Sequence, residues 1–268
     1  MIKCIATDMD GTLLNARQEV SEANRKAILA AQERGIEFLV ATGRSYREVR
    51  YVLDKAEINC PAICVNGGET RDRNGEILHS IGLDGRTSSS VTKVLEDMGI
   101  YFEVYAEAGT YTTSREKGID VIVDIYHTAN PERNIEEIRD TAEERFKQRL
   151  IHVVDGYEEI FNSAECKVYK FLAFSMDEPL LLEASQRLKK VAGIEVTSSG
   201  RNNLEITHEE AQKGIALEKY AQAKGIDLAD TMAFGDNFND ISMLKKVGHS
   251  VAMGNAEQPV KDACRFET

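Results

Sequence analysis

Two aspartates stand one residue apart directly after the first apolar run of the sequence. The run IKCIAT ends at Thr7, and the segment DMDGT then supplies Asp8, Asp10 and Gly11. Two carboxylates on one turn can divide two tasks, because one can attack a substrate or bind a metal while the other transfers a proton. The same residue types, Asp-x-Asp-Gly, also occur in ordinary turns and in calcium-binding loops. A helix-loop-helix calcium site does not fit, because its Gly stands at the sixth loop position, whereas Gly11 follows the second aspartate at once.

A second turn with polar groups follows the apolar run IEFLVA. It contains Thr42 and Gly43, which offer a hydroxyl and a sterically unhindered backbone N–H. Both groups can hold the oxygens of a phosphoryl group, although a simple strand-to-helix turn is the alternative explanation. The next residue, Arg44, is either a further cation for such a group or a solvated helix residue.

A third turn, GDNFND, supplies Asp236, Asn239 and Asp240 after the apolar run TMAF. Mg²⁺ prefers an octahedron of oxygen ligands and usually keeps several waters, so Asp236 and one or two carboxylates of the first turn would suffice to bind it. Lys213 stands where another helix is expected to begin. Its compact charge suits a doubly charged phosphate, although most lysines are surface residues.

These turns follow short apolar strands that alternate with helices. Such alternation predicts an α/β fold with a doubly wound, mainly parallel sheet, and ligands bind such sheets outside the carboxyl ends of the strands. The three turns are therefore expected at one edge of the sheet. The expected strands are 2–7, 36–41, 61–65, 203–207, 231–235, 249–254 and 264–267, and the expected helices are 21–35, 45–56, 213–224 and 241–247.

The pattern changes between these two outer sections. Residues 69–82 contain Asn74-Gly75 between two short strand candidates and predict a hairpin. We expect two domains, a core domain formed by 1–82 and 203–268 and an inserted α/β domain formed by 83–202. Helices of the inserted domain are expected at about 87–98, 134–147 and 178–191, and its strands at 101–106, 167–174 and 194–199.

The composition excludes several classes of partner. The chain of 268 residues has a formal net charge of −12 and no dense block of Lys or Arg, so neither nucleic acid nor an anionic membrane is an expected partner. No stretch approaches the roughly 20 apolar residues that cross a bilayer. Five scattered cysteines indicate buried, reduced thiols in the cytoplasm. Only Cys60 and Cys64 lie close together, and without a second pair or a His cluster a zinc site is not expected.

The motifs DMDGTLL, ATGR, a lone Lys followed by Gly, and GDNFND, in this order, resemble the haloacid dehalogenase superfamily, and more closely its Cof-type phosphatase branch. The resemblance covers 1–82 and 203–268, and the middle section corresponds by position to the α/β cap domain of that branch. It implies a Rossmann-like core and a Mg²⁺-dependent hydrolase that removes phosphate from a small phosphorylated metabolite. Sugar phosphates and cofactor phosphates are the substrate classes that it suggests.

The resemblance also assigns roles by position. It makes Asp8 the nucleophile that forms an aspartyl-phosphate, and Asp10 the acid that protonates the leaving oxygen and then the base that activates water. Lys213 would balance the charge between Asp8 and the phosphate. The phosphoryl oxygens would be held by Thr42, Gly43 and Asn239, and Mg²⁺ by Asp8, the backbone carbonyl of Asp10 and Asp236, with Asp240 as support.

Two alternatives to a phosphatase remain open. A phosphomutase acting on sugar phosphates would use the same Asp8 but return the phosphate to another hydroxyl, and a catalytically weak protein would bind a phosphorylated metabolite without turnover. A dehalogenase fits less well, because that chemistry needs neither Asp10 nor magnesium.

We expect a monomer or a small homo-oligomer. Because members of this branch usually continue with a short acidic turn and a last helix, the resemblance also implies a C-terminus truncated at Thr268.

Overall fold

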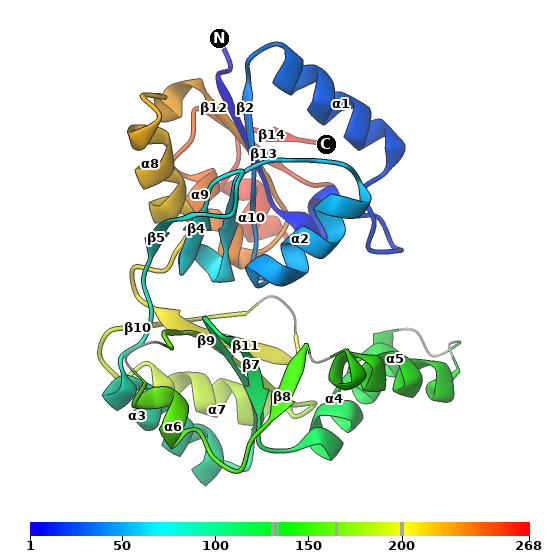
Figure 1. Ribbon diagram of the computed structural model, residues 1–268, viewed down its shortest axis with the longest axis vertical. Coiled ribbons are helices and arrows are strands. Elements are labelled where there is room, and N and C mark those ends of the chain that lie inside the picture. Colours follow the sequence, from blue (N-terminus) through cyan, green and yellow to red (C-terminus); the bar gives the residue numbers. More distant parts are fainter. Residues whose placement is uncertain (130–131, 133, 149, 164–165, 199–200) are drawn as a thin grey trace. The chain divides into compact units, whose positions relative to one another are not determined.

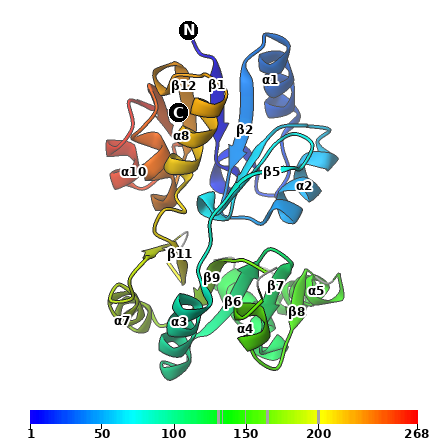
Figure 2. The same ribbon diagram turned by 60° about the vertical axis from the view of Figure 1, so that its left-hand side comes forward.

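The computed structural model describes residues 1–268 apart from 130–131, 133, 149, 164–165 and 199–200. It consists of two compact units, one formed by Met1–Ile81 with Glu210–Thr268 and the other by Gly82–Glu209 (Figures 1 and 2). The boundary at which the chain returns to the first unit thus falls after residue 209, whereas the sequence analysis placed this domain boundary after residue 202. The difference arises because the strand β11 (Asn203–His208) pairs with two strands of the second unit, β9 (Val168–Phe174) and β10 (Ile194–Thr197).

The first unit is built on the predicted parallel sheet, which confirms the α/β fold class. Within the described residues, eight strands lie in the order β14-β13-β12-β1-β2-β3-β4-β5. The pairs from β14 to β3 are parallel, and the hairpin of β4 and β5 adds an antiparallel edge. The strands are β1 (Cys4–Thr7), β2 (Glu37–Ala41), β3 (Ala62–Cys64), β4 (Glu69–Arg71), β5 (Ile77–Ser80), β12 (Thr231–Gly235), β13 (His249–Ala252) and β14 (Phe266–Glu267).

Helices cover both faces of this sheet (Figure 1). On one face α8 (Lys213–Ala223), α9 (Ile241–Leu244) and α10 (Gln258–Asp262) bury an apolar cluster that includes Leu217, Met243 and Val260. On the other face α1 (Glu22–Glu33) contacts β2. The remaining helix of this unit is α2 (Tyr46–Lys55).

Side-chain caps fix where two of these helices begin. Ser21 accepts a hydrogen bond from Asn24 N at the start of α1, as its sequence position predicts. Ser45 and Glu48 form a reciprocal capping box at the start of α2. The turn between β2 and α2, which carries Thr42, Gly43 and Arg44, is therefore held between a buried strand and a capped helix.

The second unit is a separate α/β layer structure. Six strands of its described residues lie in the order β10-β11-β9-β6-β7-β8, with only the pair of β7 and β8 parallel. The strands not yet named are β6 (Tyr101–Ala106), β7 (Gly109–Thr112) and β8 (Ile151–Val153). One face of the sheet buries an apolar cluster against α3 (Gly85–Asp97), α6 (Glu158–Phe161) and α7 (Glu178–Leu188). A smaller cluster joins α4 (Arg115–Ala129) to α5 (Ile135–Lys147).

Most predicted elements of the second unit are present within a few residues. The helices α3, α5 and α7 match the predicted ones, and position 199 of the last predicted strand lies outside the described residues. The helix α4 was not predicted. Four of the five residues from Ile119 to Val123 are β-branched, a composition more typical of a strand than of a helix.

The environment of the cysteines agrees with the prediction of reduced thiols. All five are free, and Cys4, Cys60 and Cys64 are buried. Burial raises the pKa of both Cys4 and Cys60 to about 12, so these thiols stay protonated near neutral pH. Among the helices that the structure describes, none combines the length and apolar character needed to cross a membrane.

Candidate active site

The turn after β1 brings Asp8 to the carboxyl edge of the sheet. Asp8 is 5% exposed, and its backbone N–H donates to Phe234 O of β12. The chain then turns through Gly11, which has a φ of +78°. A Cβ at Gly11 would lie 2.3 Å from Oδ2 of Asp236, so this position requires glycine both for its backbone conformation and for the close approach of that carboxylate.

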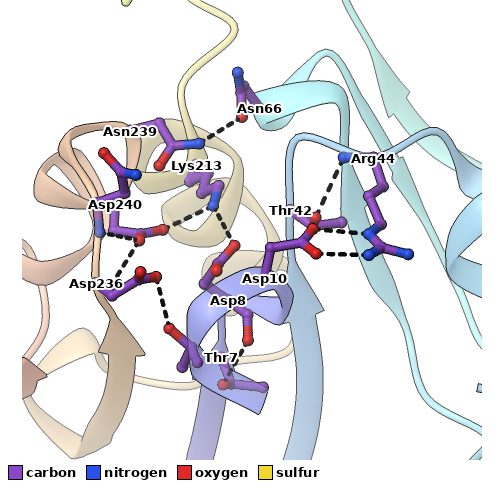
Figure 3. A network of polar contacts seen from close by, with 12 residues as sticks. Thr7, Asp8, Asp10, Thr42, Arg44, Asn66, Lys213, Asp236, Asn239 and Asp240 are labelled. Atoms are coloured by element: carbon purple, nitrogen blue, oxygen red, sulfur yellow. Dashed lines mark hydrogen bonds and ion pairs between the residues drawn. The ribbon is translucent and has the colours of Figure 1, made fainter. Parts of the chain in front are cut away.

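Lys213 is the first residue of α8 and is fully buried, which is unusual for a lysine. Its Nζ donates to Oδ1 of Asp8 and to Oδ1 of Asp240, each at 2.7 Å (Figure 3). Burial acts to lower the pKa of Lys213, but the charges of Asp240 and Asp8 outweigh it, and the pKa is raised. Lys213 therefore holds a permanent positive charge between two carboxylates.

The GDNFND turn folds around the carboxylate of Asp240, which is fully buried. Oδ2 of Asp240 accepts the backbone N–H groups of Asp236 and Asn237, each at 3.0 Å, while Oδ1 accepts from Lys213. Asp240 thus accepts three hydrogen bonds from the protein, one of them from a buried ammonium group. These hydrogen bonds hold the GDNFND turn together, and the supporting role of Asp240 at a metal site stays a prediction.

Three aspartates lie close enough to share a cation. One carboxylate oxygen each of Asp8, Asp236 and Asp240 lies within 4.8 Å of the others. Burial raises the pKa of Asp8 well above its usual range, Asp240 and Asp236 raise it further, and Lys213 opposes the rise. Burial also raises the pKa of Asp236. Crowded carboxylates of this kind are stabilised by a cation, and a set of oxygen donors alone suits a hard ion such as Mg²⁺.

The carboxylate of Asp10 points to a different partner. Arg44 donates from Nε to Oδ2 at 2.7 Å and from Nη2 to Oδ1 at 2.5 Å, and Nη2 also contacts Oε1 of Gln18. The backbone N–H of Arg44 donates to Oγ1 of Thr42 at 3.2 Å. The sequence left Arg44 as either a cation for a phosphoryl group or a solvated helix residue. In the structure its side chain instead forms an ion pair with Asp10 (Figure 3).

Asn239 contacts Asn66, a residue that the sequence analysis did not select. Its Nδ2 donates at 3.2 Å to Oδ1 of Asn66, which follows β3 and has a φ of +60°. The position of Asn66 after a third parallel strand is the signal that could have identified it, because such strand ends share the edge that carries Asp8.

Two further side chains at this edge were also missed, and both bind Asp236. Oγ1 of Thr12 donates to Oδ1 of Asp236 at 3.0 Å, and Nδ2 of Asn255 donates to Oδ2 at 3.0 Å. Thr12 lies in the first turn and Asn255 in the turn after β13. Hydroxyl and amide residues at strand ends are too common in ordinary turns to be selected by type alone.

Most of the predicted site residues, together with Arg44 and Asn66, fall into three contacting groups in the first unit. Asp8, Lys213, Asp236 and Asp240 form one, Asp10, Thr42 and Arg44 the second, and Asn239 and Asn66 the third (Figure 3). Gly43 lies in the same turn as Thr42 and Arg44. All of them come from the carboxyl ends of parallel strands or from the start of α8.

Known proteins are similar to this chain in both sequence and fold. Residues 5–268 match the family model of the haloacid dehalogenase-like hydrolases. The 5-amino-6-(5-phospho-D-ribitylamino)uracil phosphatase YwtE of Bacillus subtilis (strain 168) is 35% identical, with 100% of this chain and 93% of that protein aligned. Phosphatase YwpJ of the same organism is 33% identical over 97% of this chain and 92% of its own. A solved haloacid dehalogenase-like hydrolase from B. subtilis superposes with a TM-score of 0.89 at 33% identity, covering 100% of this chain and 94% of that one.

Proposed function

The chain belongs to the haloacid dehalogenase-like hydrolases and is a phosphoric monoester hydrolase, and we propose that it works through an aspartyl-phosphate formed on Asp8 with Mg²⁺ as cofactor. The observation that carries this proposal is the buried carboxylate of Asp8, held by Lys213 at 2.7 Å and grouped with Asp236 and Asp240 within 4.8 Å. A nucleophilic carboxylate needs such surroundings, because its own charge repels a phosphate.

In the first half of the proposed reaction, an oxygen of Asp8 forms a bond to phosphorus while the bond from phosphorus to the leaving oxygen breaks. Lys213 keeps one oxygen of Asp8 in place and its charge offsets the repulsion between the two anions. Mg²⁺ bound by Asp8, the carbonyl of Asp10 and Asp236 would neutralise charge on the phosphoryl oxygens. Asp10 donates a proton to the leaving oxygen.

In the second half, Asp10 takes a proton from water, the water oxygen bonds to phosphorus, and the bond to Asp8 breaks to release inorganic phosphate. Thr42, Gly43 and Asn239 are the proposed contacts of the phosphoryl oxygens. Arg44 pairs with both carboxylate oxygens of Asp10 and holds this side chain near the turn that carries Asp8, so one oxygen must leave Arg44 and carry a proton before Asp10 can act as an acid. The proton donor and the nucleophile thus come from the same turn after β1.

The substrate is a small phosphorylated metabolite. We propose to test three kinds of compound first. They are sugar phosphates, cofactor phosphates and the ribitylamino-uracil phosphate that appears in the name of the relative with 35% identity. We further propose that Gly82–Glu209 is the cap domain of this phosphatase. We also propose a cytoplasmic location, which the five free cysteines support.

The experiment is phosphate release from a panel of these compounds and p-nitrophenyl phosphate, with Mg²⁺ or with EDTA, for the wild type and Asp8→Asn. The proposal expects release that depends on Mg²⁺ and is lost in Asp8→Asn. Release that survives EDTA and the substitution would contradict it. Turnover that needs a sugar bisphosphate activator and returns the phosphate to the sugar would identify a phosphomutase instead.

A further inference from the structure

Asn255 connects two parts of the candidate site that are distant in the sequence. It follows β13, and its Nδ2 donates to the backbone oxygen of Gly11 at 3.1 Å and to Oδ2 of Asp236 at 3.0 Å. Gly11 belongs to the turn that carries Asp8 and Asp10. One side chain therefore links that turn to Asp236, although the hydrogen bonds span 244 and 19 residues of sequence.

The chemistry of its partners fixes which way this amide points. A backbone carbonyl and a carboxylate can only accept hydrogen bonds, so the nitrogen of Asn255 must face them and its oxygen must face away. An amide nitrogen carries two hydrogens, and each has an acceptor here. No other orientation of the amide satisfies both partners.

The second oxygen of Asp236 accepts a hydrogen bond from a different residue. Oγ1 of Thr12 donates to Oδ1 at 3.0 Å, so each oxygen of this carboxylate has one donor and the plane of the group is fixed. Mg²⁺ demands nearly ideal octahedral geometry from its ligands, whereas Ca²⁺ accepts irregular and more numerous oxygens. Partners that orient a ligating carboxylate therefore matter more for Mg²⁺.

We propose that Asn255 is a positioning residue of the Mg²⁺ site, which sets the carboxylate of Asp236 relative to the turn of Asp8 and Asp10. This inference rests on the proposed function, because it assigns Asp236 as a ligand. In this role Asn255 is not itself a ligand but acts through its hydrogen bond to Asp236. A position whose side chain is exposed to solvent thus contributes to the metal preference of a partly buried site.

The test measures binding of Mg²⁺ and of Ca²⁺ by isothermal titration calorimetry without substrate. It compares the wild type with Asn255→Ala, Asp236→Ala and the control Gln258→Ala. The side chain of Gln258 is also an exposed amide, and it donates to Asp262 at 2.8 Å within α10. Asn255→Ala should weaken Mg²⁺ binding about 10-fold or more and Ca²⁺ binding less, while Gln258→Ala should bind both ions like the wild type.

Two results would overturn the inference. Unchanged Mg²⁺ affinity in Asn255→Ala, with or without a lower melting temperature, would reduce Asn255 to a structural residue of its turn. Equal loss of Mg²⁺ and Ca²⁺ affinity would contradict the proposed contribution of Asn255 to the preference for Mg²⁺. A different result would overturn the metal site of the proposed function itself, namely a wild type that binds no Mg²⁺ or an Asp236→Ala variant that binds it unchanged.

Discussion

The ammonium group of Lys213 lies 2.7 Å from the carboxylate of Asp8, although the two residues are 205 positions apart in the sequence. The same nitrogen lies 2.7 Å from Asp240, and all three side chains are buried. A single cation thus stands between the proposed nucleophile and the residue that folds the GDNFND turn. Its removal leaves two carboxylates without their shared positive partner.

Replacing Lys213 by Met should therefore reduce phosphatase activity far more than replacing an exposed lysine of the same helix. We expect kcat to fall by about 10²–10³, the usual effect of removing one donor that stabilises charge in a transition state. Lys219→Met is the control, because its side chain is 43% exposed. Steady-state kinetics measures kcat, and circular dichroism shows whether each variant is folded. A near-normal kcat in a folded Lys213→Met would contradict the assigned role.

Gly11→Ala should lose Mg²⁺ affinity and activity. The added Cβ would lie 2.3 Å from Oδ2 of Asp236, so that carboxylate must move. Gly35→Ala is a matched control, since Gly35 has a φ of +75° but no atom within 4 Å of an added Cβ. Gly35→Ala should then only lower stability, by about 1–2 kcal/mol for the left-handed backbone. Similar Mg²⁺ affinities for the two variants in calorimetric titrations would refute the steric explanation.

Arg44→Gln should affect substrates according to how much their leaving group needs a proton. Arg44 holds both oxygens of Asp10. A displaced proton donor slows loss of an alkoxide more than loss of p-nitrophenolate, which leaves without protonation. The ratio of kcat/KM between a sugar phosphate and p-nitrophenyl phosphate should fall at least about 10-fold, and Arg47→Gln, an exposed residue of α2, should leave it unchanged. An equal loss for both substrates would point to a general structural defect.

Asp84 gives a prediction for the second unit that does not depend on catalysis. Its side chain caps α3 by accepting from Thr87 N at 2.7 Å, and this hydrogen bond lowers its pKa. Asp84→Ala should lower the free energy of unfolding at pH 7 by about 1 kcal/mol. A lowered pKa in the folded state means that this stabilisation is present above the ordinary carboxyl pKa of about 4 and is lost as the pH falls through the folded value.

Urea unfolding at pH 7 and at pH 3 measures this effect. The difference between the wild type and Asp84→Ala should shrink at the lower pH. Asp97→Ala at the other end of α3 is the control, because an acid at a helix C-terminus is not stabilising and its loss should be neutral or slightly favourable. A difference that grows at pH 3 would have the opposite sign to the one expected for a hydrogen-bonded carboxylate.

Much of the first unit follows from the sequence, because its parallel strands are short, apolar and bounded by polar turns. That pattern alone is enough to predict that Asp8, Thr42 and Asp236 share one sheet edge. The burial of Lys213 could not be predicted from its surroundings in the sequence. It depends on the close packing of α8 on α9, where a Cβ at Gly214 would lie 2.1 Å from Ser242 O.

The contacts that could not be predicted from the sequence depend on the directions in which side chains point. The ion pair of Arg44 with Asp10 and the bridge from Asn255 to Asp236 depend on side-chain directions that strand and helix patterns do not contain. The strand β11 was assigned to the first domain because its alternating sequence fits either sheet, and only its pairing with β9 and β10 decides between them.

The central claim is a covalent phosphoryl group on Asp8, and trapping it is the most direct test. In Asp10→Asn the first step with p-nitrophenyl phosphate should proceed without a proton donor, while water attack should be slow because its base is missing. Rapid mixing with Mg²⁺ should then give a burst of p-nitrophenolate equal to the enzyme concentration, and peptide mass spectrometry after acid quench should place one phosphoryl group on Asp8. Turnover without a burst, together with no phosphorylated peptide or one that does not contain Asp8, would contradict the mechanism.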